Sequence, residues 1–146
     1  MDYYNQIKEE LINNEAYKAV KDYSKNENDL KTYYNVGKLL SEAGKHYGEG
    51  IIKKYAIKLV QEVRKKYNER TLRRIRQFYI TFCDEKWSEL PTKLTWSHYC
   101  ELLKLKDYNE INYYIDISIR QNLPHKKLRE KISNKEYQRL SDDYKI

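Results

Sequence analysis

The stretch RTLRRIRQFY at residues 70–79 carries the side chains with the clearest chemistry in this sequence. At 100° per residue of an α-helix, its polar members fall within about 100° of arc, opposite an apolar stripe. These polar members are Arg70, Arg73, Arg74 and Gln77. A guanidinium group can bind guanine O6 and N7, and a glutamine amide can bind adenine N6 and N7. The pattern therefore indicates a helix that presents a nucleic-acid-binding face.

Positive charge is concentrated around this stretch. Residues 45–76 contain 11 Lys or Arg against three acids, a local net charge of +8, whereas the whole chain carries +7. Such a segment repels itself, and a polyanionic partner is a natural reason to keep it. The further candidates for DNA contact are Lys53, Lys54, Lys58, Lys65, Lys66 and Arg76. The same charges also fit a solvated basic face whose arginines pair with acids elsewhere in the fold.

The elements that must position these side chains are helices. The chain has only four Gly and two Pro, and no segment alternates between apolar and polar residues with turn signals at its ends. Apolar residues recur at steps of three and four from Ile52 to Tyr67, and Asn68 follows as a helix cap. Two helices joined by about three residues, the second one basic, make a helix-turn-helix candidate over 49–83. We expect one all-α domain over 1–146, a compact multi-helix bundle with little or no sheet.

Capping signals predict where the other helices begin and end. Asn13 and Asn14 suggest an interruption of the first helical segment, and Gly44 marks the end of the second. The stretch DEKWSELPTKL, which contains Pro91, is the expected loop. The residues expected to begin helices are Asn28 or Asp29, Thr95, Asn109 and Pro124, with a Ser133–Glu136 capping box before a short last turn.

No arrangement of side chains predicts an enzyme. The three histidines, His46, His98 and His125, are scattered. Cys83 and Cys100 form no usual zinc spacing with His98, which favours ordinary buried or half-buried residues over metal ligands. The Asp-x-Lys fragments at 29–31 and 84–86 lack the second acid and the strand of a metal-dependent nuclease, and no Gly-rich loop precedes a lysine. The sequence therefore assigns no catalytic residue, no metal and no cofactor, and we expect the two cysteines to be reduced thiols.

Composition and targeting signals limit the class of protein. With 40% hydrophobic and 35% charged residues, the chain is expected to fold. No apolar run reaches the ~20 residues of a membrane span. The N-terminus MDYYNQIKEE has neither the basic start nor the apolar centre of a signal peptide. We therefore expect a cytoplasmic protein that does not contact a membrane.

The sixteen tyrosines allow two interpretations. Aromatic rings can stack on unpaired bases. Most of these tyrosines, however, fall on apolar helical faces, where a ring packs in the core and its hydroxyl reaches a polar group. We expect core positions for most of them, and Tyr47 and Tyr67, which flank the basic helix, stay open as stacking candidates.

Several stretches carry a resemblance to a known family. They are TYYNVGKLLSEAG, YAIKLVQEVRKKYNERTLRRIRQFY, LTWSHYCELLKLKD, INYYIDISIRQNLPHKKLREKI and EYQRL. Over roughly residues 3–141 the chain resembles the N-terminal domain of the YhcG-type PD-(D/E)XK nuclease family. The resemblance implies a helical, winged-helix-like DNA-binding domain, which in the family precedes a C-terminal nuclease domain. Because this chain is expected to stop before that domain, the resemblance assigns it no cleavage.

Two departures from the family pattern affect what the resemblance implies. Asn68 stands where members commonly have a Ser-type cap, and this change keeps the capping chemistry. Leu123 and Pro124 stand where members often have a Trp-Ser pair, which removes a cap hydroxyl and some aromatic packing. The second departure bears on how the C-terminal segment docks.

Two functions of different class follow from these observations. The first is a DNA-binding module that grips double-stranded DNA and reads base edges with the basic helix. The alternative is a protein-interaction module that docks an acidic partner or the family's own nuclease domain. Both are electrostatic, and both leave a homo-oligomer open.

Overall fold

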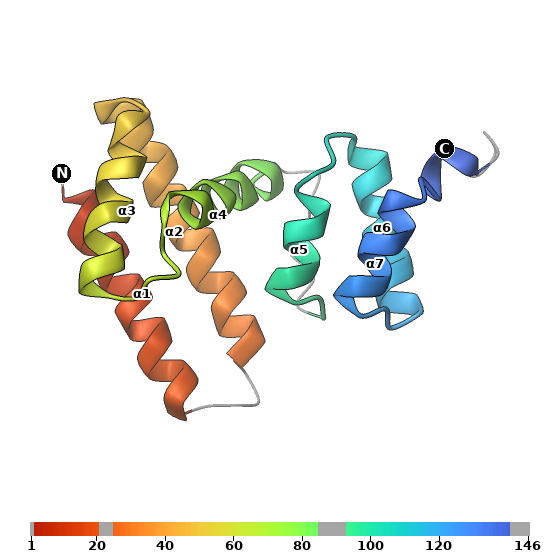
Figure 1. Ribbon diagram of the computed structural model, residues 1–146, viewed down its shortest axis with the longest axis horizontal. Coiled ribbons are helices and arrows are strands. Elements are labelled where there is room, and N and C mark those ends of the chain that lie inside the picture. Colours follow the sequence, from red (N-terminus) through yellow and green to blue (C-terminus); the bar gives the residue numbers. More distant parts are fainter. Residues whose placement is uncertain (1, 21–24, 85–92, 141–146) are drawn as a thin grey trace. The chain divides into compact units, whose positions relative to one another are not determined.

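The computed structural model describes residues 2–20, 25–84 and 93–140, and these residues form seven α-helices and one 3₁₀ turn (Figure 1). The elements are α1 (Tyr3–Val20), α2 (Lys25–Tyr47), α3 (Gly50–Glu62), α4 (Glu69–Phe82), α5 (Trp96–Leu102), α6 (Tyr108–Arg120), α7 (His125–Ser133) and η1 (Tyr137–Arg139). The predicted all-α fold class is confirmed. No strand occurs in the described ranges, so they contain no β-wing beside the helices.

The chain divides into two compact units, residues 1–90 and 91–146, and each is described by itself. The prediction of one domain over 1–146 stays a prediction. The basic segment 45–76 lies entirely within the first unit. Most of the predicted loop, residues 85–92, lies outside the described residues.

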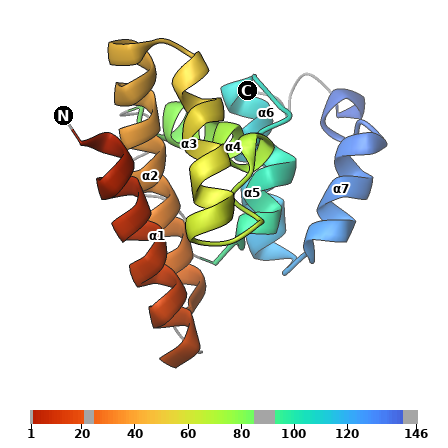
Figure 2. The same ribbon diagram turned by 60° about the vertical axis from the view of Figure 1, so that its left-hand side comes forward.

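The first unit is built around α2, which contacts α1, α3 and α4. Figures 1 and 2 show α1 and α2 side by side, with α4 crossing α2. Each helix contributes apolar side chains that are fully removed from solvent, and these stabilise the unit through the hydrophobic effect. They include Ile7 and Leu11 of α1, Val36 and Leu40 of α2, Ile52 and Leu59 of α3, and Leu72, Ile75 and Phe78 of α4.

The crossing of α2 and α4 depends on Gly37. A Cβ atom placed on Gly37 would lie 2.5 Å from the backbone oxygen of Ile75 and 2.7 Å from the Cβ of Tyr79. Both distances are shorter than two such atoms can approach, so only the absence of a side chain allows this separation of the helices. Gly37 therefore fixes where α4, and the basic side chains on it, stand against α2.

Hydrogen bonds of the buried Asn14 side chain join α1 to α2, and two predictions in this region are wrong. The Nδ2 of Asn14 donates to Asp29 at 2.9 Å, and the Nδ2 of Asn28 donates to the Oδ1 of Asn14 at 2.5 Å. Because this amide is satisfied by a neighbouring helix, α1 runs through Asn13 and Asn14 without the expected interruption. Asn28 and Asp29 likewise lie inside α2, which begins at Lys25.

Two predicted helix ends in the first unit are also wrong. The second helix passes Gly44 and ends at Tyr47, where Gly48 takes a φ of +92° and turns the chain. The third ends at Glu62, and the amides of Val63 and Arg64 both donate to the carbonyl of Leu59. The linker to α4 therefore spans residues 63–68, longer than the three residues expected.

The second unit contains α5, α6, α7 and η1. Thr95 caps α5 as predicted, and the backbone amide of Thr95 donates to the Nδ1 of His98 at 3.1 Å. The Nε2 of His98 donates to the carbonyl of Leu123 at 2.7 Å. Both ring nitrogens therefore make hydrogen bonds within the second unit. A histidine that is protonated at Nε2 donates there and keeps Nδ1 as an acceptor. His98 is buried, the environment that the sequence favoured for it.

Outcomes at the other predicted caps are mixed. Pro124 stands at the start of α7 as expected, whereas Asp107, not Asn109, caps α6 by accepting the amide of Glu110. The Ser133–Glu136 capping box is wrong. There Lys135 has a φ of +56°, and Glu136 accepts the hydroxyl of Tyr113 at 2.8 Å and pairs with Lys131. The Glu136 side chain, which a capping box would need, is therefore engaged in tertiary contacts instead.

Candidate nucleic-acid interface

The fourth helix has the form that the sequence predicted. The side chain of Asn68 accepts the backbone amide of Thr71 at 3.0 Å, so it caps the helix. One stripe of α4, including Leu72 and Phe78, is buried against the rest of the unit. The polar stripe lies on the other side, which confirms the amphipathic arrangement of this basic helix.

Five of the predicted DNA-contacting cations have no acidic partner in the part of the chain that the structure describes. Four are exposed, and Arg74 is half-buried on the outer stripe of α4. Gln77 is also exposed, and its Nε2 donates to the Oγ1 of Thr81 at 3.1 Å. The exposed four are Lys53 and Lys54 of α3, Lys65 of the linker, and Arg70 of α4. We call these five cations the open basic surface.

Arg73 and Arg76 lie against acids instead. The Nε of Arg73 donates to Glu69 at 2.9 Å, and its Nη1 lies 3.6 Å from the Oε2 of Glu49. Arg76 donates to the same oxygen of Glu49. The hydrogen bond from Arg76, with the charge of Arg76 and then of Arg73, lowers the pKa of Glu49.

A second acid, Glu15 of α1, binds three residues of the linker between α3 and α4. It accepts the hydroxyl of Tyr67 at 2.6 Å and pairs with Arg64 at 2.8 Å and with Lys66 at 2.9 Å. Burial would raise the pKa of Glu15, but hydrogen bonds from Tyr67, Lys66 and Arg64 outweigh it and lower the pKa to about 2. All three consecutive cations are exposed, and Lys65, between the two that pair with Glu15, is the one without an ion pair among the described residues.

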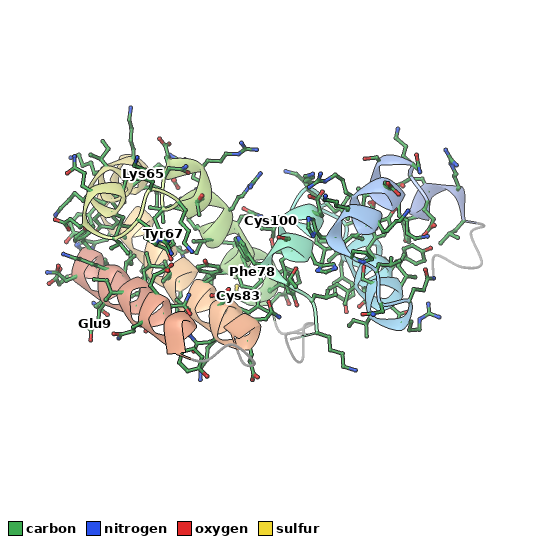
Figure 3. The ribbon with its side chains drawn as sticks, turned by 60° about the horizontal axis from the view of Figure 1, so that its bottom comes forward. Glu9, Lys65, Tyr67, Phe78, Cys83 and Cys100 are labelled. Atoms are coloured by element: carbon green, nitrogen blue, oxygen red, sulfur yellow. The ribbon has the colours of Figure 1, made fainter. Side chains whose placement is uncertain are left out.

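The last candidate lysine, Lys58, and the two stacking candidates, Tyr47 and Tyr67, lie in three different environments. The ammonium group of Lys58 lies 4.1 Å from the centre of the Tyr4 ring, a cation–π contact. Tyr67 is fully buried, so it cannot stack on a base, and Figure 3 shows it inside the unit, deeper than Lys65. Tyr47 is half-exposed, and its ring meets that of His46 edge to face at 4.5 Å.

Residues 6–139 match the family described as the DUF1016 N-terminal domain. The chain belongs to this family. The resemblance to the YhcG-type N-terminal domain that its sequence suggested is thereby confirmed. No curated protein and no solved structure matches the chain.

Within this DUF1016 N-terminal domain, sequence reasoning missed the acids that hold the basic residues. Segment 45–76 contains three acids, and each one is engaged inside the first unit. Glu49 binds two arginines, Glu62 pairs with Lys8 at 3.2 Å, and Glu69 pairs with Arg73. The sequence did offer a signal for these ion pairs. Only three acids stand among 11 cations, and a lone acid in a basic segment is surrounded by possible partners.

Metal-ligating groups are not assembled in the described part of the DUF1016 N-terminal domain. No set of three or more His, Cys, Asp or Glu side chains there is placed to hold an ion. Cys83 is exposed at the end of α4 in the first unit, while Cys100 is half-buried in the second. None of the described helices combines the length and apolar character that crossing a membrane requires.

Proposed function

We propose that the first unit binds double-stranded DNA through α3, the linker 63–68 and α4. The open basic surface is the observation that carries this proposal. Its five cations, Lys53, Lys54, Lys65, Arg70 and Arg74, have no acidic partner among the described residues, although the acids of the same segment are all engaged. Unpaired like charges on a folded surface repel one another, and duplex phosphates would relieve that repulsion.

The dimensions of α4 suit a duplex. Its 14 residues extend about 21 Å, and an α-helix fits the DNA major groove, which is about 12 Å wide. In this proposal Arg70, Arg74 and Gln77 face the groove, while Lys53, Lys54 and Lys65 lie on flanking phosphates. If the five cations together release the counterions of about five phosphates, log K should fall with log[salt] at a slope of about −4 to −5.

The family supplies a setting for this activity. In the YhcG-type proteins that the chain resembles, such a domain precedes a nuclease domain of PD-(D/E)XK type. We infer that this unit holds DNA for catalysis carried out by another domain and has no catalytic residue of its own. We also infer that it works in the cytoplasm.

Reversing two charges on α4 tests the proposal. Arg70→Glu/Arg74→Glu should weaken binding to a duplex of about 20 bp by roughly 2 kcal/mol, about 30-fold, because two cations that face the groove become anions that the duplex repels. Fluorescence anisotropy at ~50 mM salt measures this loss. The matched control is Lys31→Glu/Lys38→Glu, which makes the same charge change at exposed positions of α2 outside segment 45–76. Equal losses in both variants would contradict a defined interface.

A second pair of variants separates reading of sequence from grip on the backbone. Gln77→Ala should change the preference among duplex sequences by about 1–3 kcal/mol at one base pair, because an amide recognises adenine edges. Lys65→Ala should weaken all sequences alike and make the salt slope shallower by about one. Competition assays with a randomised duplex pool measure both effects. Uniform weakening by both variants would mean that α4 holds the duplex without reading it.

One observation favours a second candidate, a protein-interaction module. Ile57 is 55% exposed on the face of α3 that also presents Lys53, Lys54 and Lys58. An apolar side chain ringed by lysines suits an acidic protein surface with an apolar centre, such as the family's own nuclease domain. A chain that fails to bind duplex DNA at ~50 mM salt would favour this candidate over the first.

A further inference from the structure

We propose that Arg73 and Arg76 form a phosphate site that Glu49 occupies in the free protein, acting as an internal stand-in for the ligand. The proposal rests on the proposed function in one respect, since it names the duplex backbone as the source of the phosphate. Arg73 and Arg76 would thus join the interface only after Glu49 leaves.

The geometry around Glu49 is that of a bound anion. A single carboxylate oxygen, Oε2, accepts from Arg76 and lies 3.6 Å from the Nη1 of Arg73. Two guanidinium groups on consecutive turns of α4 therefore converge on one oxygen. Phosphate oxygens are bound in the same way, because guanidinium donors match carboxylate and phosphate geometry alike.

Both arginines stay placed if Glu49 leaves. The side chain of Arg76 is only 18% exposed, and its Nη1 lies 3.6 Å from where a Cβ on Gly44 would stand. The guanidinium group therefore lies against the backbone of α2 at ordinary contact distance. Arg73 keeps its separate hydrogen bond to Glu69 at 2.9 Å. The site is therefore preorganised for an incoming anion, which lowers the cost of binding.

Glu49, in contrast, lies at the surface, open to solvent. Its side chain is 68% exposed, and its backbone lies between Gly48 and Gly50 in the connection from α2 to α3. A Cβ added at either glycine would meet no atom within 4 Å, so the space around this connection is open. Ion pairs at exposed carboxylates contribute little to stability, and a phosphate of higher charge density competes well for the same donors.

The first arm of the test uses inorganic phosphate and Glu49→Gln. Thermal unfolding is followed in sodium phosphate and in sodium chloride at matched ionic strength. Phosphate should raise the Tm of Glu49→Gln clearly more than that of the parent chain, because the site is vacated. Adding Arg76→Gln should abolish the extra stabilisation. A Glu49→Gln chain without a phosphate response would overturn the proposal, whatever its affinity for DNA.

The second arm uses a duplex and a matched control, Glu69→Gln. Glu49→Gln should bind the duplex about fivefold more tightly than the parent, since no internal acid competes. Glu69→Gln removes the same charge beside Arg73 but leaves Glu49 on Arg76, so it should gain clearly less. Equal gains would show a general charge effect and overturn the stand-in role. A phosphate response without any duplex binding would support the anion site and overturn its duplex source, which separates this proposal from the proposed function.

Discussion

Gly37→Ala is expected to lower the free energy of unfolding of the first unit by about 3 kcal/mol. The added Cβ would stand 2.5 Å from the backbone oxygen of Ile75 and 2.7 Å from the Cβ of Tyr79. Neither atom is the end of a flexible side chain, so the clash cannot be relieved by a change of rotamer. The two helices must separate, which opens the packing of Val36, Leu40 and Phe78.

Gly44→Ala provides the matched control for this prediction, because it makes the same change in the same helix. A Cβ at Gly44 would meet its nearest neighbour, the Nη1 of Arg76, at an ordinary 3.6 Å. Alanine favours helix over glycine by up to about 1 kcal/mol, so this variant should be neutral or stabilised. Urea unfolding followed by circular dichroism at 222 nm measures both variants. Destabilisation of both by a similar amount would mean that loss of glycine, and not the close crossing, decides the outcome.

Glu15→Gln has the second largest expected effect, a loss of about 2–3 kcal/mol at pH 7. Glu15 is 17% exposed and receives Tyr67, Arg64 and Lys66 together. The amide can still accept the hydroxyl of Tyr67, but it carries no charge for the two cations. The linker then loses the contact that holds it to α1.

The pH dependence of this loss has a definite sign. The pKa of Glu15 lies at about 2 in the folded chain against an ordinary value of 4.5. A lowered pKa means that the unfolded chain binds the proton first, so the stabilisation is complete above about pH 4.5 and disappears as the pH falls toward 2. The difference between parent and Glu15→Gln in urea unfolding should therefore shrink steadily across that window.

Glu9→Gln is the control for the acid-dependent effect. Glu9 is exposed on the same helix, as Figure 3 shows, and it makes no ion pair within the described residues. Its replacement should leave both stability and the acid response unchanged within about 0.5 kcal/mol. A Glu15→Gln difference that persists undiminished at pH 2 would mean that lost packing, rather than lost charge, explains the first effect.

The sequence predicted the features that depend on local chemistry. The apolar stripe of α4, the Asn68 cap and the Thr95 cap each require only residues within one helical turn, and all three are present. The all-α class followed from the same periodicity. The prediction of exposed cations on the outer face of α4 also holds for Arg70, because it followed from the same stripe.

The errors come from contacts between segments distant in sequence. The spacing of Val63 and Tyr67 continued the apolar pattern of α3, yet Glu15 of α1 binds Tyr67 and draws the linker out of the helix. Asn14 looked like a break because asparagine competes with helical hydrogen bonds, and a partner on α2 satisfied it. Periodicity cannot reveal such partners, since they are set by tertiary packing.

The candidate site was predictable in composition but not in pairing. The candidates lie in α3 and α4 as expected, except that Lys65 and Lys66 lie in the linker and not in the helix predicted there. The division between the open basic surface and the arginines held by Glu49 depends on a turn at Gly48 that brings Glu49 beside α4. This contact could not be predicted from the sequence alone, because Glu49 and Arg73 are 24 positions apart and only the fold brings them together.

The crossing at Gly37 also restricts how this family can diverge. A side chain that collides with another side chain is accommodated by shortening the second one, but no substitution at position 75 removes a main-chain carbonyl. A lineage that lost this glycine would need a coordinated redesign of two helices before regaining fitness. We therefore expect relatives that lack a glycine at position 37 to pair these two helices differently.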